Sequence, residues 1–247
     1  MTHGLQGRKS SMLFNDSDDE YLALANQGSG VANLNPLASD AFSISLWFYT
    51  DSTSTHALFS NRQSTGDGWW LGLTSQKLDF RWYSSGAGSS DITTFDSDGY
   101  RASLYNGPWS HAVITYNGNG NGTGLKMYIN AALIETGPSA TIGTTTSSDE
   151  IRIGKGYSAA SYKYSGSISN VSFWDKELTE AEVDFIYHGN DGGRGPGDLN
   201  FHPAFSNCIG WWLADHPDDD SSKIYDNTAS NNNFTPNNSP TLLKLSP

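Results

Sequence analysis

Apolar and polar residues alternate along most of this chain, in short runs of the length of β-strands. The clearest run is FSISLWFY at residues 42–49, in which four large apolar residues share one parity. Successive side chains of a strand point to opposite faces, so this run has one fully apolar face and one that is half polar and half aromatic. The pattern predicts a strand with its apolar face in a core.

The same pattern recurs along the chain. Further strands are predicted at residues 21–24, 57–60, 69–73, 78–83, 109–116, 124–129, 133–134, 150–154 and 166–174. Residues 74–77 and the Gly/Asn-rich residues 117–123 form the turns of two hairpins, and residues 84–99 carry loop signals. Many short strands with turns between them are typical of an antiparallel β-sandwich.

The spacing of apolar residues changes from that of a strand to that of a helix once, after residue 178. Thr179-Glu-Ala-Glu182 is a capping box, followed by the apolar residues Val183, Ile186 and Tyr187 and by a possible C-cap at Gly189. This predicts one short helix near residues 179–188.

A Gly/Pro-rich segment at residues 191–203 separates this helix from the tail. The tail is too short to fold as a second domain without disulfides or a bound metal. It contains strand-like runs at 209–213, 223–225 and 233–235. We therefore predict that residues 16–247 form a single sandwich that includes the C-terminal strands. Residues 1–15 are predicted to be an N-terminal arm, which could anchor the domain to a larger assembly.

Composition and charge narrow the function. The net charge of −12 disfavours nucleic acid and anionic membrane surfaces as partners, because both require a cationic face. The single cysteine, Cys208, permits no intramolecular disulfide. Residues 1–20 lack the apolar stretch of a signal peptide and no run is long enough to span a membrane, so we expect folding in a cytoplasm without membrane insertion.

Several motifs resemble the concanavalin-A-like lectin/glucanase superfamily, and within it the laminin-G-like jelly rolls. They are the strand at 42–49, Trp109-Ser-His111 with the hairpin that ends at Asn130, residues 151–154, and residues 166–174 followed by the capped helix. The resemblance implies an all-β, antiparallel two-sheet jelly-roll sandwich. The Gly210-Trp-Trp-Leu213 unit sits at the C-terminal end, an arrangement that resembles laminin-G-like proteins of bacteriophage virions.

Because this superfamily includes glucanases, we searched the sequence for catalytic carboxylates. Retaining glycosidases need two carboxylates about 5–5.5 Å apart. Only Glu182-Val-Asp184 begins the laminarinase-type spacing, and it falls in the predicted helix. His111 alternates with apolar residues on a strand, which favours a hydrogen-bonded structural histidine. We therefore expect no catalytic residues and no enzymatic activity.

Paired aromatics are the candidates for carbohydrate binding, because sugar rings stack on Trp and Tyr. They are Trp69 with Trp70, Trp82 with Tyr83, and Trp211. Consecutive strand residues face opposite ways, so one residue of each pair points away from its neighbour. The alternative is that opposing sheet and loops bury both faces.

Acidic loops offer a second kind of site. Asp91, Asp96 and Asp98 form one cluster, and Asp215 with Asp218, Asp219 and Asp220 forms another. Carboxylate oxygens are ligands of Ca²⁺, so Ca²⁺ is a candidate cofactor, although neither loop has an EF-hand pattern and solvated turns are the alternative.

These observations, with the resemblance, favour a non-catalytic virion structural or decoration protein on the capsid, tail or fibre. It would be made in the host cytoplasm, displayed on the virion surface and partnered by other virion proteins or by itself as a homo-oligomer, with host or environmental polysaccharide as a further ligand. A free carbohydrate-binding lectin is the alternative, and a glycan hydrolase is a weaker one.

Overall fold

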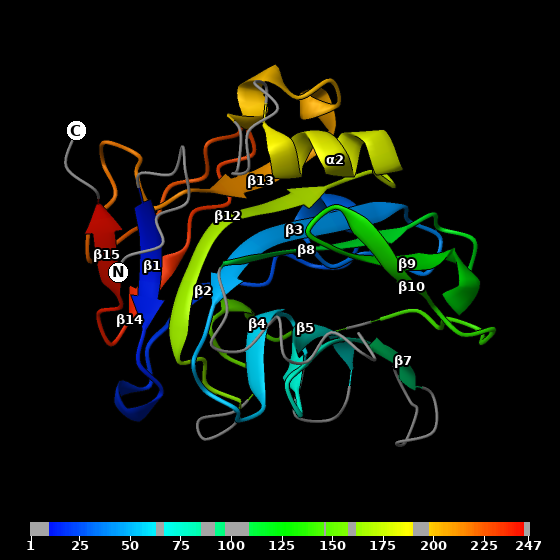
Figure 1. Cartoon of the computed structure of the whole chain (residues 1–247), viewed down its shortest axis with the longest axis horizontal. Helices are drawn as coiled ribbons and strands as arrows, with labels where there is room; N and C mark the ends of the chain where they lie inside the picture. Colours follow the sequence, from blue (N-terminus) through cyan, green and yellow to red (C-terminus); the bar gives the residue numbers. More distant parts are fainter. Residues whose placement is uncertain are drawn as a thin grey trace.

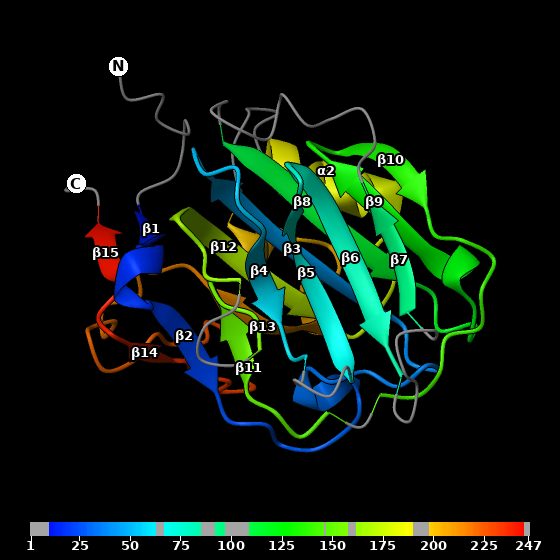
Figure 2. The ribbon, with the colours of Figure 1, turned by 90° about the horizontal axis from the view of Figure 1, so that it is seen from below.

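The computed structural model describes residues 10–62, 67–84, 92–96, 109–145, 147–157, 162–189 and 198–244, of which 92–96 and Lys244 are described by their backbone alone. Two antiparallel sheets face each other across one core (Figures 1 and 2). The predicted all-β sandwich is confirmed, and the short helix predicted near residues 179–188 is present among the described residues.

The first sheet has eight strands. Their order is β10 (Ala132–Thr136), β9 (Leu125–Ile129), β8 (Ser110–Tyr116), β3 (Phe42–Tyr49), β12 (Gly166–Trp174), β1 (Ser10–Phe14) and β15 (Thr241–Lys244), with β13 (Cys208–Trp212) also paired to β12. β1 and β13 share one edge of β12, because β1 pairs with residues 166–168 and β13 with residues 171–174.

The second sheet has seven strands. Their order is β14 (Thr235–Asn237), β2 (Tyr21–Leu24), β11 (Ile151–Ile153), β4 (His56–Ser60), β5 (Gly68–Thr74), β6 (Lys77–Tyr83) and β7 (Ile92–Asp96). Short 3-10 turns lie at Asp16–Asp18, Val31–Asn33, Gly122–Gly124, Leu199–Phe201 and Phe205–Asn207.

The core lies between the sheets and is rich in aromatic rings. Phe42 stacks on Phe173 with ring centroids 5.8 Å apart, and Phe59 meets Trp69 edge-on at 4.9 Å. Each such side chain, when fully buried, contributes roughly 1.5–3 kcal/mol of hydrophobic free energy. The period-two pattern at residues 42–49 therefore places its apolar face as predicted, since Phe42, Ile44, Leu46 and Phe48 all belong to this core.

Helix α2 (Glu180–His188) lies across the outer face of the eight-stranded sheet (Figure 1). Its capping box forms as predicted, with the Thr179 hydroxyl accepting from the backbone N–H of Glu182 and the Glu182 carboxylate accepting from that of Thr179. Val183 and Ile186 pack in a second apolar cluster, together with Trp174 and Trp211. Among the described helices, none is long and apolar enough to cross a membrane.

Strands near both ends of the described residues belong to the sandwich. Of the predicted tail strands, the one at 209–213 forms β13, which pairs with β12, and the one at 233–235 lies two residues early, because β14 is Thr235–Asn237 and pairs with β2. The predicted strand at 223–225 is wrong, since only Ile224 forms an isolated bridge, with Phe234, and β15, which pairs with β1, was not predicted. The predicted arm of residues 1–15 is wrong for residues 10–14, because these form β1 between β12 and β15. Met12 and Phe14 are buried in the core and Leu13 between them is exposed, but the apolar run Met-Leu-Phe has no period-two pattern that would predict this strand from sequence.

The predicted loop before residue 100 was also wrong. Residues 84–99 were predicted to be a loop, but residues 92–96 form β7, the edge strand that pairs with β6. The sequence ITTFD does not alternate apolar with polar residues, and it is the backbone pairing with β6 that defines this strand.

Candidate functional site

The register of β5 and β6 shows which residue of each aromatic pair faces the core. Trp69 lies opposite Trp82, and both side chains belong to the core between the sheets. Their indole N–H groups donate to the carbonyls of Leu34 and Gly143. Trp69 and Trp82 are 0% and 1% exposed, so the prediction that they offer a sugar-stacking surface is wrong.

Trp70 and Tyr83 have the opposite parity and lie on the outer face of the seven-stranded sheet. They form a small apolar cluster with Ala57, against which Tyr162 packs. They too are buried, at 2% and 3% exposure, so neither is an open stacking platform by itself. Their surroundings are nevertheless unlike the core, because charged and half-buried aromatic residues cover them.

We call this group the outer-face cluster. Its members are Arg62, Trp70, Arg81, Tyr83, Tyr157 and Tyr162. Two of them are on β6, one on β5, and the others on the segments that follow β4 and β11.

Trp70 is the base of the outer-face cluster. Its indole lies over Gly72, where an added Cβ would come within 2.5 Å of the ring and 2.2 Å of the His56 carbonyl. Any side chain at position 72 would therefore displace the indole or the strand. The Arg81 guanidinium carbon lies 4.8 Å from the Trp70 ring centre, and the Tyr162 ring lies 6.1 Å from it.

Arg62 lies between two aromatic rings. Its guanidinium carbon is 4.1 Å from the ring centre of Tyr83 and 4.2 Å from that of Tyr157. Tyr157 in turn contacts Tyr162, with ring centroids 5.7 Å apart. Contacts between a guanidinium and ring faces are favourable and hold the planar group in a fixed orientation.

An ion pair sits beside these rings. The Arg81 Nε donates to Asp79 Oδ2 at 2.8 Å. Burial by itself lowers the pKa of Arg81, but the hydrogen bond and negative charge of Asp79 outweigh it, so the net pKa is raised. Burial also raises the pKa of Tyr83, which therefore stays protonated at neutral pH.

Two N–H donors of the outer-face cluster have no acceptor. Among the described residues, neither the indole Nε1 of Trp70 nor the Nε of Arg62 has a hydrogen-bond partner, although both atoms are buried from solvent. A buried donor without an acceptor costs about 1–3 kcal/mol. A ligand rich in oxygen acceptors would satisfy both donors if it displaced the side chains that cover them.

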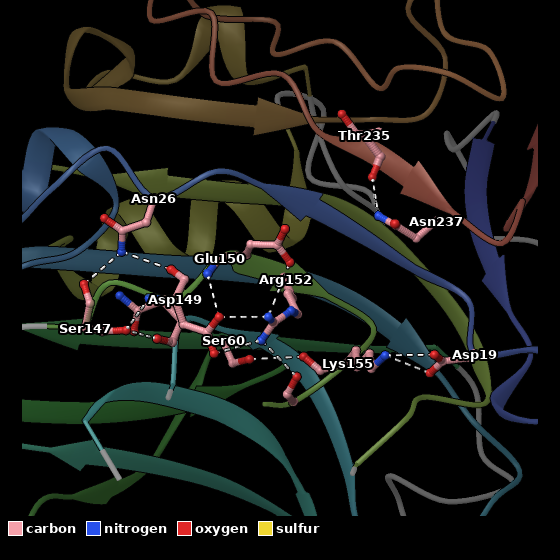
Figure 3. Close-up of polar contacts among 12 residues, drawn as sticks. Asp19, Asn26, Ser60, Ser147, Asp149, Glu150, Arg152, Lys155, Thr235 and Asn237 are labelled. Atoms are coloured by element: carbon pink, nitrogen blue, oxygen red, sulfur yellow. Dashed lines mark hydrogen bonds and ion pairs between the residues drawn. The ribbon is translucent and has the colours of Figure 1, made fainter. Parts of the chain in front are cut away.

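A network of paired charges continues along the same sheet, over β2, β11 and β4 (Figure 3). Arg152 donates to Asp149 at 2.9 Å and to Glu150 at 3.3 Å. Lys155 pairs with Asp19 at 2.8 Å, and its carbonyl accepts from the Ser60 hydroxyl at 3.0 Å. These groups neutralise each other, so this part of the face is held together internally.

Trp211, the fifth aromatic candidate, lies on the other sheet. It is 3% exposed, its indole N–H donates to the Asn170 side-chain oxygen, and Phe205 meets its ring at 6.0 Å. Asn170 has a φ of 48° at an irregularity in the register of β12. The prediction that Trp211 stacks on sugar is therefore wrong, because the ring is sealed beneath the segment that follows α2.

The acidic candidates do not converge where they are described. Asp215 and Asp218 lie at the surface, Asp219 accepts from the backbone N–H groups of His216 and Tyr225, and Asp220 accepts from those of Ser222 and Lys223. Within the described residues, no group of three or more His, Cys, Asp or Glu side chains could hold a metal ion. Asp219 and Asp220 are engaged in turns and Asp215 and Asp218 are exposed, which agrees with the solvated turns that the sequence left open.

The other acidic cluster stays a prediction. Asp91 and Asp98 lie outside the described residues, and Asp96 is placed by its backbone on β7, opposite Asp79.

The residues tested for catalysis have structural roles. Glu182 caps α2, and Asp184 pairs with His188 on the same helix at 2.9 Å. His111 is buried, bonds to the Ser45 hydroxyl at 2.8 Å and stacks on Trp47 with ring centroids 4.9 Å apart. The interpretation of His111 as a hydrogen-bonded structural residue is confirmed.

Sequence reasoning missed most of the outer-face cluster. Arg81 could have been found, because it shares the parity of Asp79 and Tyr83 on a strand that was predicted. Arg62, Tyr157 and Tyr162 lie in connections without periodicity. No spacing rule brings them together, and only the folding of the β11–β12 connection against β4 does so, through bonds such as Ala57 N–H to the Tyr162 carbonyl.

Comparison with solved structures supports the fold. A Bacteroides ovatus protein, assigned provisionally to carbohydrate binding, has a TM-score of 0.65 at 16% identity over 97% of this chain and 61% of its own. A native heptameric SAP-like pentraxin from Limulus polyphemus has a TM-score of 0.56 at 14% identity over 96% of both chains. The binding domain of Paraclostridial Mosquitocidal Protein 1 has a TM-score of 0.52 at 17% identity, over 72% of this chain and 46% of its own.

The chain thus spans less than two thirds of the Bacteroides and mosquitocidal chains. At these identities the likeness concerns the fold alone. No curated protein matches the sequence. Residues 16–184, well over half of the chain, match the Laminin_G_3 family, and the protein therefore belongs to the concanavalin A-like lectin/glucanases superfamily.

Proposed function

We propose that this protein is a non-catalytic, lectin-like domain that binds carbohydrate at the outer-face cluster. The observation that carries the proposal is the unmet indole N–H of Trp70, buried beside the half-buried rings of Tyr157 and Tyr162. Sugars present apolar ring faces together with many hydroxyl oxygens, and so match a site that combines aromatic rings with unsatisfied donors.

The carboxylates on this face whose ion pairs are described support binding over hydrolysis. Asp79 is paired with Arg81, Asp149 and Glu150 with Arg152, and Asp19 with Lys155. A retaining glycosidase instead holds one carboxyl group as an acid with a raised pKa. The provisional assignment of the Bacteroides protein to carbohydrate binding agrees with this proposal.

Calorimetry against a panel of oligosaccharides tests the proposal. We expect micromolar-to-millimolar binding that weakens about tenfold when Tyr162 or Tyr157 is replaced by Ala, since ring contacts are worth about 0.5–1.5 kcal/mol each. Phe201→Ala is the matched control, because Phe201 is an exposed aromatic in the segment that follows α2. No heat with any sugar at millimolar concentration contradicts the proposal, and release of reducing sugar contradicts its non-catalytic part.

We further propose that the domain is displayed on the surface of a bacteriophage virion, docked to other virion proteins or to copies of itself. The observation that favours this placement is the C-terminal unit at residues 210–234, which resembles phage laminin-G-like proteins and here joins the sandwich through β13, with β14 directly after it. Mass spectrometry of purified particles and the neighbouring genes test the placement. A gene far from capsid or tail genes, or particles without the protein, would contradict it.

A further inference from the structure

The cationic side chains on the outer face of the seven-stranded sheet differ in whether a carboxylate pairs with them. Arg81 pairs with Asp79, Arg152 with Asp149 and Glu150, and both Lys155 and Lys163 with Asp19. No carboxylate among the described residues lies within ion-pair distance of Arg62. Arg62 is therefore a cation whose charge the described part of the chain leaves uncompensated.

The packing of Arg62 limits what can approach it. The guanidinium carbon of Arg62 lies 4.1 Å from the ring centre of Tyr83 and 4.2 Å from that of Tyr157, so both rings cover it. Rings that stack on a guanidinium leave its edge, with the N–H donors, as the binding surface. That edge matches a carboxylate or a sulfate, which accept two parallel hydrogen bonds from it.

The Nε of Arg62 supports the same conclusion. This atom is buried and has no acceptor among the described residues. The same holds for the Nε1 of Trp70, which is 2% exposed. Arg62 and Trp70 both touch the Tyr83–Arg81 part of the cluster, because Arg62 packs on Tyr83 and Arg81 packs on Trp70. The cluster thus offers a positive charge and two unsatisfied donors in one place.

We propose that the sugar bound here is acidic, a uronate or a sulfated sugar, and that its anionic group pairs with the edge of Arg62. This inference rests on the proposed function and names its ligand class. The net charge of −12 disfavours extended anionic surfaces, whereas a single anionic group at Arg62 responds mainly to charges within about 8 Å at physiological salt.

The experiment is calorimetry with the whole chain and matched sugars. The probes are tetragalacturonate, its fully methyl-esterified form and a sulfated galactose oligosaccharide, so that charge changes while the ring chemistry is largely kept. We expect one of the two anionic probes to bind at least about tenfold more tightly than the uncharged ester, as a charge-assisted contact requires. The tighter of the two anionic probes distinguishes carboxylate from sulfate.

Variants assign the effect to Arg62. Arg62→Gln is expected to abolish the preference for the acidic probe, and Arg62→Lys to retain only part of it, because an ammonium lacks the planar edge. Arg152→Gln is the control, a cation on the same sheet that already has carboxylate partners. Unchanged circular dichroism and thermal midpoints show that the variants fold.

The outcomes separate the two proposals. Equal binding of ester and acid, or an acid preference that survives Arg62→Gln in the folded variant, overturns the acidic-sugar inference and leaves carbohydrate binding standing. Absence of binding to every sugar, neutral or acidic, overturns the proposed function and this inference with it.

Discussion

The ion pair between Lys155 and Asp19 gives a quantitative test of how the first turn of the chain is held to the seven-stranded sheet. The Lys155 side chain is 5% exposed, and its ammonium lies 2.8 Å from Asp19 Oδ1 (Figure 3). The ammonium also lies 4.2 Å from the ring centre of Tyr21. The pair joins the β1–β2 turn to the connection that follows β11. Replacing Lys155 by Met keeps most of the apolar stem and removes the charge.

The magnitude follows from what remains around Asp19. Removing one partner of a fully buried pair costs about 3–5 kcal/mol. Asp19 is partly exposed and keeps Lys163 at 3.4 Å, so we expect a smaller cost for Lys155→Met, about 2 kcal/mol of unfolding free energy. Lys163→Met is the matched control. Its side chain is more exposed, and we expect a cost below about 1 kcal/mol.

Urea unfolding followed by tryptophan fluorescence measures both costs. A double-mutant cycle with Asp19→Asn isolates the pair, and the double variant should lose less than the sum of the two single losses. If Lys155→Met costs no more than Lys163→Met, or if the losses simply add, burial of Lys155 does not strengthen its contact with Asp19 and the reasoning fails.

Three further predictions concern other parts of the fold. His202 is buried against Trp174, and its Nδ1 accepts from the Ala204 N–H. Burial lowers the pKa of His202, so its contribution to the unfolding free energy should be complete above about pH 6.5 and be lost as the pH falls below that value. His202→Gln should therefore reduce the difference in unfolding free energy between pH 7.5 and pH 5. Thr179→Ala removes the N-cap of α2 and should cost about 1 kcal/mol in urea unfolding, whereas a cost near zero would show that packing alone holds the helix. Gly72→Ala should cost about 1–3 kcal/mol and change the near-ultraviolet circular dichroism of Trp70, since the added Cβ overlaps the indole; an unchanged spectrum would contradict that contact.

Local pattern alone determined much of the fold. The alternation at residues 42–49 placed β3 to the residue, and Thr179 with Glu182 identified the start of α2 through a contact between residues three apart. Such features depend on neighbours in sequence, so they are legible in a single chain. The strands at 10–14 and 92–96 were missed because neither SSMLF nor ITTFD alternates apolar with polar residues, so that only pairing with β12 and with β6 defines them.

The tertiary structure decided which aromatic residues could meet a ligand. Adjacent tryptophans on a strand must face opposite sides, but only the facing of the two sheets sends Trp69 into the core and Trp70 to the outer face. Arg62 is separated from Tyr83 by about twenty residues and from Tyr157 by far more, and it meets both rings because the connections after β4 and β11 converge over β5 and β6. Strand periodicity is set by the chain's own geometry, whereas the composition of the outer-face cluster depends on long-range packing between segments that share no periodicity.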